Sequence, residues 1–357
     1  MAYLAGVGTA LAGNEYAQET ITRAFADLVL GEGASSSQHA LVERIHAATG
    51  VRRRFLALPL EQYPELTGFG VANDVFLDVG VDMARRAALD ALAKTGIEAH
   101  DIDYVMTATV TGIAAPSVDA RLVPTLGLRD DIKRVPVFGL GCVAGASGIA
   151  RVADYLAGHP DDVALLVCVE LCSLTVQRDD DSTANIVGAG LFGDGAAAVV
   201  MVGERRAARL GLTAPRVVAS RSTFYADTER VMGWDVGGSG FRIVLAPTVA
   251  DIVRANIGDD VKRFLADNEL DVAEITRWVT HPGGPKVLLA LAETLSLTGD
   301  ELELTWESLR HVGNLSSASV LHVLNDTMAA HSGGVHEPAI LMAMGPGFCA
   351  EFVLLDW

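Results

Sequence analysis

The sequence repeats one pattern in its two halves, and this duplication limits the possible folds more than any other feature. In the first half, an expected helix at 88–96 is followed by an apolar strand at 104–110. In the second half, an expected helix at 261–268 is followed by a strand at 277–280. The repetition predicts two similar α/β halves, each a mixed sheet covered by helices, that meet at a pseudo-twofold axis. We place the boundary near Glu204.

The same duplication aligns two residues that could carry chemistry. Residues 1–204 contain Gly141-Cys142, and residues 205–357 contain Gly313-Asn314, each before a run of small residues that opens a helix. Cys142 lies 40 positions after the isoleucine that introduces the first strand, and Asn314 lies 39 positions after its counterpart. Because the register is kept, we expect Cys142 and Asn314 to meet where the halves join, together with His281.

Cys142 is the candidate nucleophile. It follows an apolar stretch at 135–140 and opens a helix whose apolar positions recur with helical spacing until Gly158. A thiol at a helix N-terminus faces unpaired N–H groups and the positive end of the helix dipole, which favour the thiolate. A lone cysteine is more often an inert core residue. The glycines around Cys142 favour the nucleophile, because they leave room for a substrate.

His281 and Asn314 are the candidate partners of Cys142. His281 begins the turn His-Pro-Gly-Gly-Pro, whose proline and glycines predict that the imidazole is presented rather than buried. We expect His281 and His311 to differ from the other seven histidines, which we place on the surface. Asn314 could donate an amide hydrogen bond from a fixed position, or it could serve as a helix N-cap.

Residues 188–193 satisfy the dinucleotide-binding pattern GxGxxG, but they follow an expected helix and lead into a strand at 196–202. Dinucleotide binding requires the reverse order, so we reject that interpretation. Phe192 is instead expected to pack near the site. Cys172 could line a cavity or be an inert packed thiol. Cys168 and Cys349 lie in apolar strands and are expected in the core.

Charge and cysteine content exclude several classes of function. Asp and Glu outnumber Lys and Arg by 45 to 27, and the net charge of −18 repels nucleic acid. Four cysteines without a CxxC pair indicate a reducing, cytoplasmic setting. We expect no secretory signal, no membrane span in the apolar stretch 163–176, and no metal site. The basic cluster 52–54 could still attract a small anion.

With these residues in view, the chain resembles the type III polyketide synthases, the chalcone synthase-like branch of the thiolase superfamily. The resemblance covers nearly the whole chain. It is carried by five motifs: Leu140-Gly141-Cys142, Leu191-Phe192-Gly193-Asp194-Gly195, His281-Pro282-Gly283-Gly284-Pro285, Gly313-Asn314-Leu315-Ser316-Ser317-Ala318 and Gly345-Pro346-Gly347.

The resemblance implies a thiolase fold of two αβαβα halves, a homodimer, and substrates delivered as coenzyme A thioesters without an organic cofactor. It implies that Cys142 is acylated and that His281 and Asn314 stabilise oxyanions. It assigns Phe192 to a gate between an entrance tunnel and a cavity, and Ala115 to the residue that reaches the partner subunit. Other positions that it assigns to substrate binding are Phe241, Cys172, Thr175, Val110, Gly188, Gly283, Gly284 and Pro346.

The resemblance is incomplete at the coenzyme A phosphates. Arg44 matches one of three basic residues that grip these phosphates in plant members, but Leu41 and Ala48 stand at the other two positions. We expect Arg52, or its neighbours Arg53 and Arg54, to compensate.

The expected reaction is iterative decarboxylative condensation of malonyl-coenzyme A onto an acyl-coenzyme A starter, followed by ring closure. Segments 111–122 and 169–179 look closest to bacterial enzymes that extend fatty acyl starters to alkylpyrones or alkylresorcinols. Two alternatives are a single-round condensing enzyme like ketoacyl synthase III, and an inactive acyl-binding scaffold.

Overall fold

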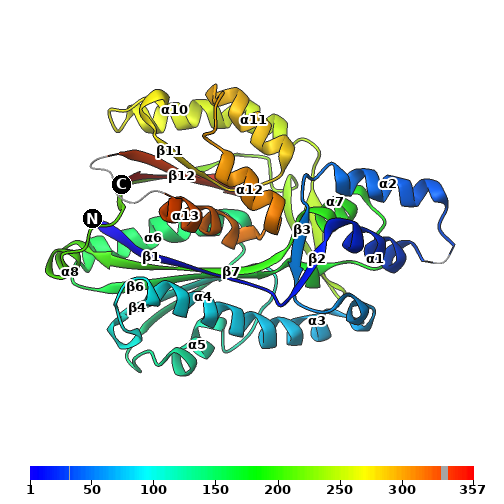
Figure 1. The fold of residues 1–357 in the computed structure, drawn as a ribbon, viewed down its shortest axis with the longest axis horizontal. Coiled ribbons are helices and arrows are strands. Elements are labelled where there is room, and N and C mark those ends of the chain that lie inside the picture. Colours follow the sequence, from blue (N-terminus) through cyan, green and yellow to red (C-terminus); the bar gives the residue numbers. More distant parts are fainter. Residues whose placement is uncertain (32, 331–336) are drawn as a thin grey trace.

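The computed structural model describes residues 1–31, 33–330 and 337–357, and Figure 1 shows their fold. The first half contributes these elements: β1 (Ala2–Leu11), β2 (Asn14–Ala17), α1 (Gln18–Leu30), α2 (Ser36–Ala47), β3 (Arg53–Leu56), α3 (Phe69–Val75), α4 (Val81–Ala93), β4 (Tyr104–Thr109), α5 (Val118–Leu126), β5 (Lys133–Phe138), α6 (Ala144–Gly158), β6 (Val163–Leu171), α7 (Thr183–Leu191), β7 (Asp194–Gly203) and α8 (Glu204–Leu210).

The second half contributes a shorter series: β8 (Arg216–Phe224), β9 (Met232–Gly237), β10 (Gly240–Leu245), α9 (Val249–Ile252), α10 (Gly258–Ala266), β11 (Arg277–Thr280), α11 (Pro285–Leu295), α12 (Glu303–Val312), α13 (Ser319–Ala330), β12 (Pro338–Gly345) and β13 (Cys349–Asp356). The predicted strand at 277–280 is confirmed as β11. The predicted helix at 88–96 is α4, which begins earlier and ends at Ala93.

The strand pairing confirms the duplication. Nine strands form one sheet in the order β11-β12-β13-β8-β1-β7-β6-β4-β5. In the first half, β4 and β6 are parallel, and β6–β7 and β7–β1 are antiparallel. In the second half, β11 and β12 are parallel, and β12–β13 and β13–β8 are antiparallel. The two series match strand for strand.

The helices repeat in the same way. A π-helical turn precedes α4 at Phe76–Gly80, and another precedes α10 at Val253–Ile257. Helices α6 and α13 lie between the strands of the two halves, α4 and α5 cover one outer face, and α10 and α11 cover the other (Figure 1). The result is the αβαβα layering that the sequence predicted.

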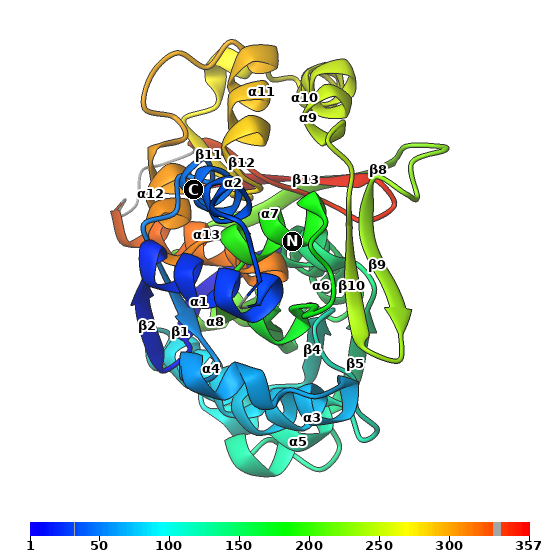
Figure 2. The same cartoon turned by 90° about the vertical axis from the view of Figure 1, so that its right-hand side faces the viewer.

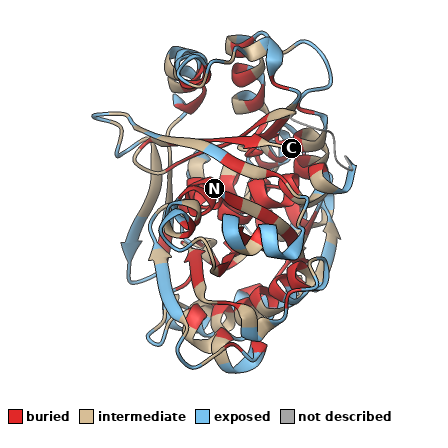
Figure 3. Ribbon diagram, turned by 90° about the vertical axis from the view of Figure 1, so that its left-hand side faces the viewer, coloured by how far each residue is buried: buried red, intermediate tan, exposed pale blue. Residues whose placement is uncertain are grey.

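Burial is concentrated in the central layers, as Figure 3 shows. Every residue of β6 and of β7 is buried, which explains why these strands are apolar almost without alternation. No helix in the described ranges is long and apolar enough to cross a membrane.

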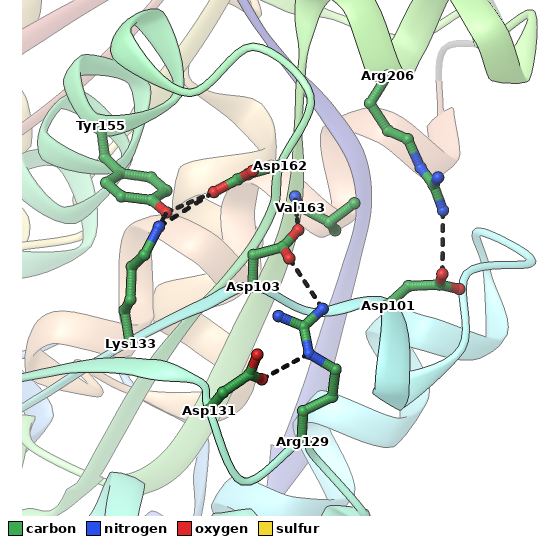
Figure 4. Close-up of polar contacts among 9 residues, drawn as sticks. All are labelled: Asp101, Asp103, Arg129, Asp131, Lys133, Tyr155, Asp162, Val163 and Arg206. Atoms are coloured by element: carbon green, nitrogen blue, oxygen red, sulfur yellow. Dashed lines mark hydrogen bonds and ion pairs between the residues drawn. The ribbon is translucent and has the colours of Figure 1, made fainter.

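A group of ion pairs fixes the loops that precede the parallel strands (Figure 4). Asp103, just before β4, accepts a hydrogen bond from the backbone N–H of Val163 at 2.8 Å, and Arg129 donates to Asp103 at 2.9 Å. Nearby, Lys133 of β5 and Asp162 both contact the Tyr155 hydroxyl, at 2.7 and 2.6 Å. These contacts join the starts of β4, β5 and β6, and so set where the opposite ends of the strands lie.

Helix α4 packs on β1 with no room for a side chain at Gly8. A Cβ atom there would lie 2.2 Å from the Ala87 carbonyl oxygen and 2.2 Å from the Ala91 nitrogen. We expect Gly8→Ala to lower the free energy of unfolding by about 1–3 kcal/mol, because backbone must move. Chemical denaturation measures the change. Gly13→Ala is the matched control, since nothing lies within 4 Å of a Cβ at Gly13, and an equal loss there would contradict this packing argument.

Candidate active site

Cys142 lies in the short 3-10 turn Gly141–Val143 that leads directly into α6. Gly141 has φ of 55°, and a Cβ on it would lie 2.8 Å from Pro346. Glycine is therefore required beside Cys142. The Cys142 thiol is buried, and its Sγ donates to the Ser316 hydroxyl at 3.8 Å. The predicted helix start at Cys142 is confirmed.

His281 follows β11 and continues its pairing, because its N–H donates to the Met342 carbonyl at 2.9 Å. The sequence predicted a presented imidazole, and this was wrong: His281 is only 3% exposed. The Gly283 N–H bonds back to the His281 carbonyl at 2.9 Å. The turn packs against the first half of the molecule, because a Cβ on Gly284 would lie 3.6 Å from the Leu191 side chain.

The prediction for the other histidines was also partly wrong. His46 and His322 are buried and contact the carbonyl oxygens of Ile186 and Ala196. Burial lowers the pKa of each to about 4. The Nε2 atom of His311, predicted to be exceptional, lies 2.8 Å from the Glu307 carboxylate on α12, outside the site.

Asn314 is held by its backbone and by its side-chain oxygen. Its N–H donates to the Leu191 carbonyl, and its carbonyl accepts from the Gly193 N–H, both at 2.9 Å. Its Oδ1 accepts from the Ser316 N–H at 2.8 Å and from the Ser319 hydroxyl at 3.3 Å. Both sequence interpretations therefore apply: the oxygen caps the following turn, and the Nδ2 group is left to face the site.

The Asn314 Nδ2 atom lies 3.3 Å from His281 Nε2. Because Nδ2 can only donate, Nε2 is the acceptor and the proton of the neutral ring is on Nδ1. Nδ1 is buried and has no hydrogen-bond partner in the described part of the chain. His281 thus presents an unprotonated nitrogen beside the Asn314 amide.

Burial opposes charge on both Cys142 and His281. It raises the pKa of the Cys142 thiol to about 12, although contacts with Ser316 and Asn314 act in the opposite direction. It lowers the pKa of His281 to about 3. A helix N-terminus contributes about 0.3–1 kcal/mol, which is too little to offset this. The resting pair is therefore a neutral thiol and a neutral imidazole, rather than the thiolate that the sequence favoured.

We expect His281→Ala to change how alkylation of Cys142 by iodoacetamide depends on pH. A thiol with a raised pKa and no adjacent base reacts in proportion to its small thiolate fraction. The rate in the variant should therefore rise roughly tenfold per pH unit from neutral to alkaline pH. The wild-type rate should depend on pH less steeply, because the neutral His281 can take the proton from the neutral thiol. Peptide mass spectrometry locates the label. Parallel pH profiles for the two proteins would show that His281 does not assist the thiol.

Two cavities meet at Phe192. The first, which we call the nucleophile cavity, has a volume of about 530 Å³ and is lined by Cys142, His281 and Asn314. Gly283 and Gly284 also line it. The second cavity has a volume of about 370 Å³, and its lining includes three residues that the sequence assigned to a cavity: Cys172, Thr175 and Gly188. Phe192 lines both.

Six predicted binding residues line neither of these cavities: Phe241, Val110, Ala115, Pro346, Arg44 and Arg52. The Phe241 ring packs 5.1 Å from the ring of Phe69, between centroids. Val110 is buried, and its N–H donates to Glu170 at 3.1 Å. Pro346 packs on the glycine beside Cys142. Ala115 is exposed, which leaves it accessible to a partner subunit.

The basic residues divide into two groups. Arg44 and Arg52 are exposed, Arg44 on the helix whose last turn borders the nucleophile cavity at Ala48. Arg54 is buried and cannot reach a ligand at the surface, so its assignment to the phosphates was wrong. Its Nη1 donates to the Phe192 carbonyl at 2.6 Å, and its Nε donates to the side chain of Gln18 at 3.0 Å.

Sequence reasoning missed three polar residues at the site. Lys286, in the first turn of α11, lines the nucleophile cavity. Ser316 accepts from the Cys142 thiol. Glu170, completely buried, accepts from the hydroxyls of Ser317 and Thr111 at 2.6 and 2.7 Å. Lys286 could have been found as the first cation after the His-Pro-Gly-Gly-Pro turn, whereas the Glu170 contacts join distant segments. In the described ranges, no group of three or more acidic, His or Cys side chains could hold a metal.

Comparisons with known proteins agree with this geometry. Residues 1–205 match the family model of chalcone and stilbene synthases, N-terminal domain, and residues 216–356 match the C-terminal domain. A 1,3,6,8-tetrahydroxynaphthalene synthase from Streptomyces peucetius subsp. caesius is 52% identical over 354 residues, covering 99% of this chain and 93% of that protein.

Two further proteins extend the comparison. An alpha-pyrone synthesis polyketide synthase-like protein, Pks18, from Mycobacterium tuberculosis (strain CDC 1551 / Oshkosh) is 32% identical, over 79% of this chain and 72% of that protein. The crystal structure of 1,3,6,8-tetrahydroxynaphthalene synthase from Streptomyces coelicolor A3(2) superposes with a TM-score of 0.91 at 27% identity, over 99% of each chain.

Proposed function

Because the chain belongs to the chalcone and stilbene synthase family, the type III polyketide synthases with their thiolase fold, we propose that it joins malonyl units repeatedly on Cys142 and closes the product into hydroxylated aromatic rings. The observation that carries this proposal is the convergence of Cys142, His281 and Asn314 on the nucleophile cavity, with a second cavity beyond Phe192. The second cavity gives a growing chain room beyond the gate.

The first step is acylation of Cys142. His281 Nε2 takes the thiol proton as the sulfur attacks the thioester carbonyl of the starter, and it keeps this proton while coenzyme A leaves as a thiolate that takes a proton from solvent. The neutral resting pair suits this exchange, because charge forms only when a substrate is present. Neither group needs to hold a charge in the empty, buried cavity.

The second step is decarboxylative extension. A malonyl thioester loses carbon dioxide, and the oxygen of the resulting enolate accepts hydrogen bonds from Asn314 Nδ2 and from a protonated His281. Preorganised donors at a developing oxyanion each contribute about 2.7–4 kcal/mol. The enolate carbon attacks the Cys142 thioester, the carbon–sulfur bond breaks, and the lengthened chain returns to Cys142 for the next cycle.

For the product, we favour a compact aromatic compound made from malonyl units alone. The ten carbons of a naphthalene equal five two-carbon units, and the relative with 52% identity is a 1,3,6,8-tetrahydroxynaphthalene synthase. A chain built from such units has an oxygen on every second carbon. The polar side chains Arg54, Tyr63 and Ser173 on the wall of the second cavity suit that chain.

A second candidate is the fatty acyl starter and pyrone or resorcinol product that the sequence favoured. The specific observation for it is the apolar part of the second cavity's lining, which includes Ile21, Phe25, Leu28 and Trp234. An alkyl chain could lie along these side chains. The relative with alpha-pyrone synthesis in its name supports the same candidate.

One incubation series separates the two candidates. The protein is incubated with malonyl-coenzyme A alone and with malonyl-coenzyme A plus acetyl, hexanoyl or long-chain acyl starters, and products are identified by mass spectrometry. An aromatic product from malonyl-coenzyme A alone supports the first candidate. Products only with a long-chain starter support the second. Single-extension products would favour a single-round condensing enzyme, and no product in any mixture would favour an inactive scaffold.

Substrate delivery and assembly complete the proposal. We expect Lys286, which lines the nucleophile cavity, and the exposed Arg44 to contact the phosphates of coenzyme A. Strand β5 is the outermost strand of the sheet (Figure 2). Its last residue, Phe138, is exposed, as is Ile113 in the loop after β4, and this leaves exposed apolar side chains at an unpaired strand edge. We expect this edge to form a homodimer, which sedimentation would detect.

A further inference from the structure

A series of short polar contacts leads from the wall of the second cavity to a buried carboxylate. Tyr63 and Ser173 both line this cavity, and their hydroxyl oxygens lie 2.5 Å apart. Ser173 Oγ in turn donates to Asp194 Oδ2, also at 2.5 Å. Because the Ser173 hydrogen is used on Asp194, Tyr63 must donate to Ser173. The proton order is Tyr63 to Ser173 to Asp194.

Asp194 is fixed as the inner end of this series. It is completely buried at the start of β7, where its carboxylate accepts N–H bonds from Ser173 at 2.8 Å and from Ala57 at 2.6 Å. Burial raises the pKa of Asp194 to about 6, while the nearby Arg54 acts to lower it. A carboxylate in this range can exchange a proton near neutral pH.

Arg54 supplies a buried positive charge close to the same group. Two of its nitrogens bind Gln18 and the Phe192 carbonyl, and Nη2 is buried without a partner in the described part of the chain. Arg54 also lines the second cavity. A phenol, a serine, a buried carboxylate and a guanidinium thus gather at the wall of a cavity that Cys142, His281 and Asn314 do not line.

Each carboxylate oxygen of Asp194 already accepts one backbone N–H bond. The hydroxyls of Tyr63 and Ser173 are additional, and both belong to the cavity wall. We propose that Tyr63, Ser173 and Asp194 form an acid–base unit that moves protons on the poly-β-ketone chain as its rings close in the second cavity. This inference rests on the proposed function and deepens it.

The chemistry balances without another reagent. A methylene between two ketones loses a proton to the Tyr63 oxygen while the Tyr63 proton moves to Ser173 and the Ser173 proton moves to Asp194. The carbanion forms a carbon–carbon bond with a ketone carbon of the same chain. The oxygen of that ketone becomes an alkoxide and receives the proton as the series reverses. Loss of water then completes an aromatic ring, and Tyr63, Ser173 and Asp194 return to their first state.

The test compares Tyr63→Phe and Ser173→Ala with the wild type in the incubation that yields product. Mass spectrometry gives the ratio of ring-closed product to lactones, which form when an enol oxygen attacks the thioester without catalysis. Released carbon dioxide reports extension at Cys142. Because acid–base groups typically contribute about 10²–10⁴-fold, we expect the ratio to fall at least about tenfold in each variant, and extension to fall far less.

Tyr16→Phe is the matched control. The Tyr16 hydroxyl accepts from the Leu60 N–H at 3.3 Å, and so contacts the same 3-10 helix, Leu60–Glu65, that holds Tyr63. Tyr16 does not line the second cavity, and we expect its product ratio to equal that of the wild type.

Two results would overturn the inference: an unchanged product ratio in both variants, or a proportional loss of ring closure and carbon dioxide release together with a lower unfolding temperature. The second result would mean that the contacts only support the fold. Failure of the proposed function is distinct, because then the wild type itself would form no polyketide.

Discussion

Cys142→Ala is expected to abolish polyketide formation, with a loss of at least about 10⁴-fold, because no other described thiol lines the nucleophile cavity. Some decarboxylation of malonyl-coenzyme A should remain, because His281 and Asn314 are still in place to stabilise the enolate. Product is measured by mass spectrometry and carbon dioxide by release of label from malonyl-coenzyme A. The two rates should therefore separate in this variant.

Cys168→Ala provides the control for loss of a buried thiol. Cys168 is completely buried in β6 and lines neither cavity. Radiolabelled starter should label the Cys168 variant and fail to label the Cys142 variant. Polyketide formation by Cys142→Ala at more than a trace would refute the assignment of the nucleophile.

Asn314→Ala is expected to produce the opposite pattern, with decarboxylation lowered by about 10²–10³-fold. The reason is that Nδ2 is the donor next to His281 Nε2, and the alanine side chain has none. Acylation of Cys142 by a starter should persist, because the thiol and His281 remain. Label from the starter and carbon dioxide release, measured on the same preparation, distinguish the two steps.

Ser319→Ala gives a graded comparison. It removes the 3.3 Å bond to Asn314 Oδ1 but leaves the 2.8 Å bond from the Ser316 N–H. The amide should remain directed to His281, so we expect a much smaller loss. Equal losses in the two variants, or an unchanged rate of carbon dioxide release in Asn314→Ala, would count against a direct role for the amide.

The sequence was informative where one residue and its local context decide the outcome. The kept register predicted that Cys142 and Asn314 come together, and both line the nucleophile cavity. The sequence also predicted that Cys142 opens a helix and that this helix ends at Gly158. In each case, short-range geometry is enough, because a turn and a helix start are determined by neighbouring residues.

The sequence failed where burial or a distant contact decides. His281 is buried because its turn faces the other half, and no local pattern reveals which side of a turn is covered. The contact between Tyr63 and Ser173 joins residues 110 positions apart. Arg54 looked like part of an exposed basic cluster, but alternation along β3 turns it inward. These facts depend on the assembled fold.

The division of the interior at Phe192 has a consequence for how such enzymes diversify. Phe192 is the one residue that belongs to the lining of both described cavities. Substitutions elsewhere on the wall of the second cavity can change the size and polarity of its space without altering a residue that lines the nucleophile cavity. Single substitutions in the second cavity can therefore change the product while the residues that form the carbon–carbon bond stay the same. In this way, new products can evolve by one substitution at a time.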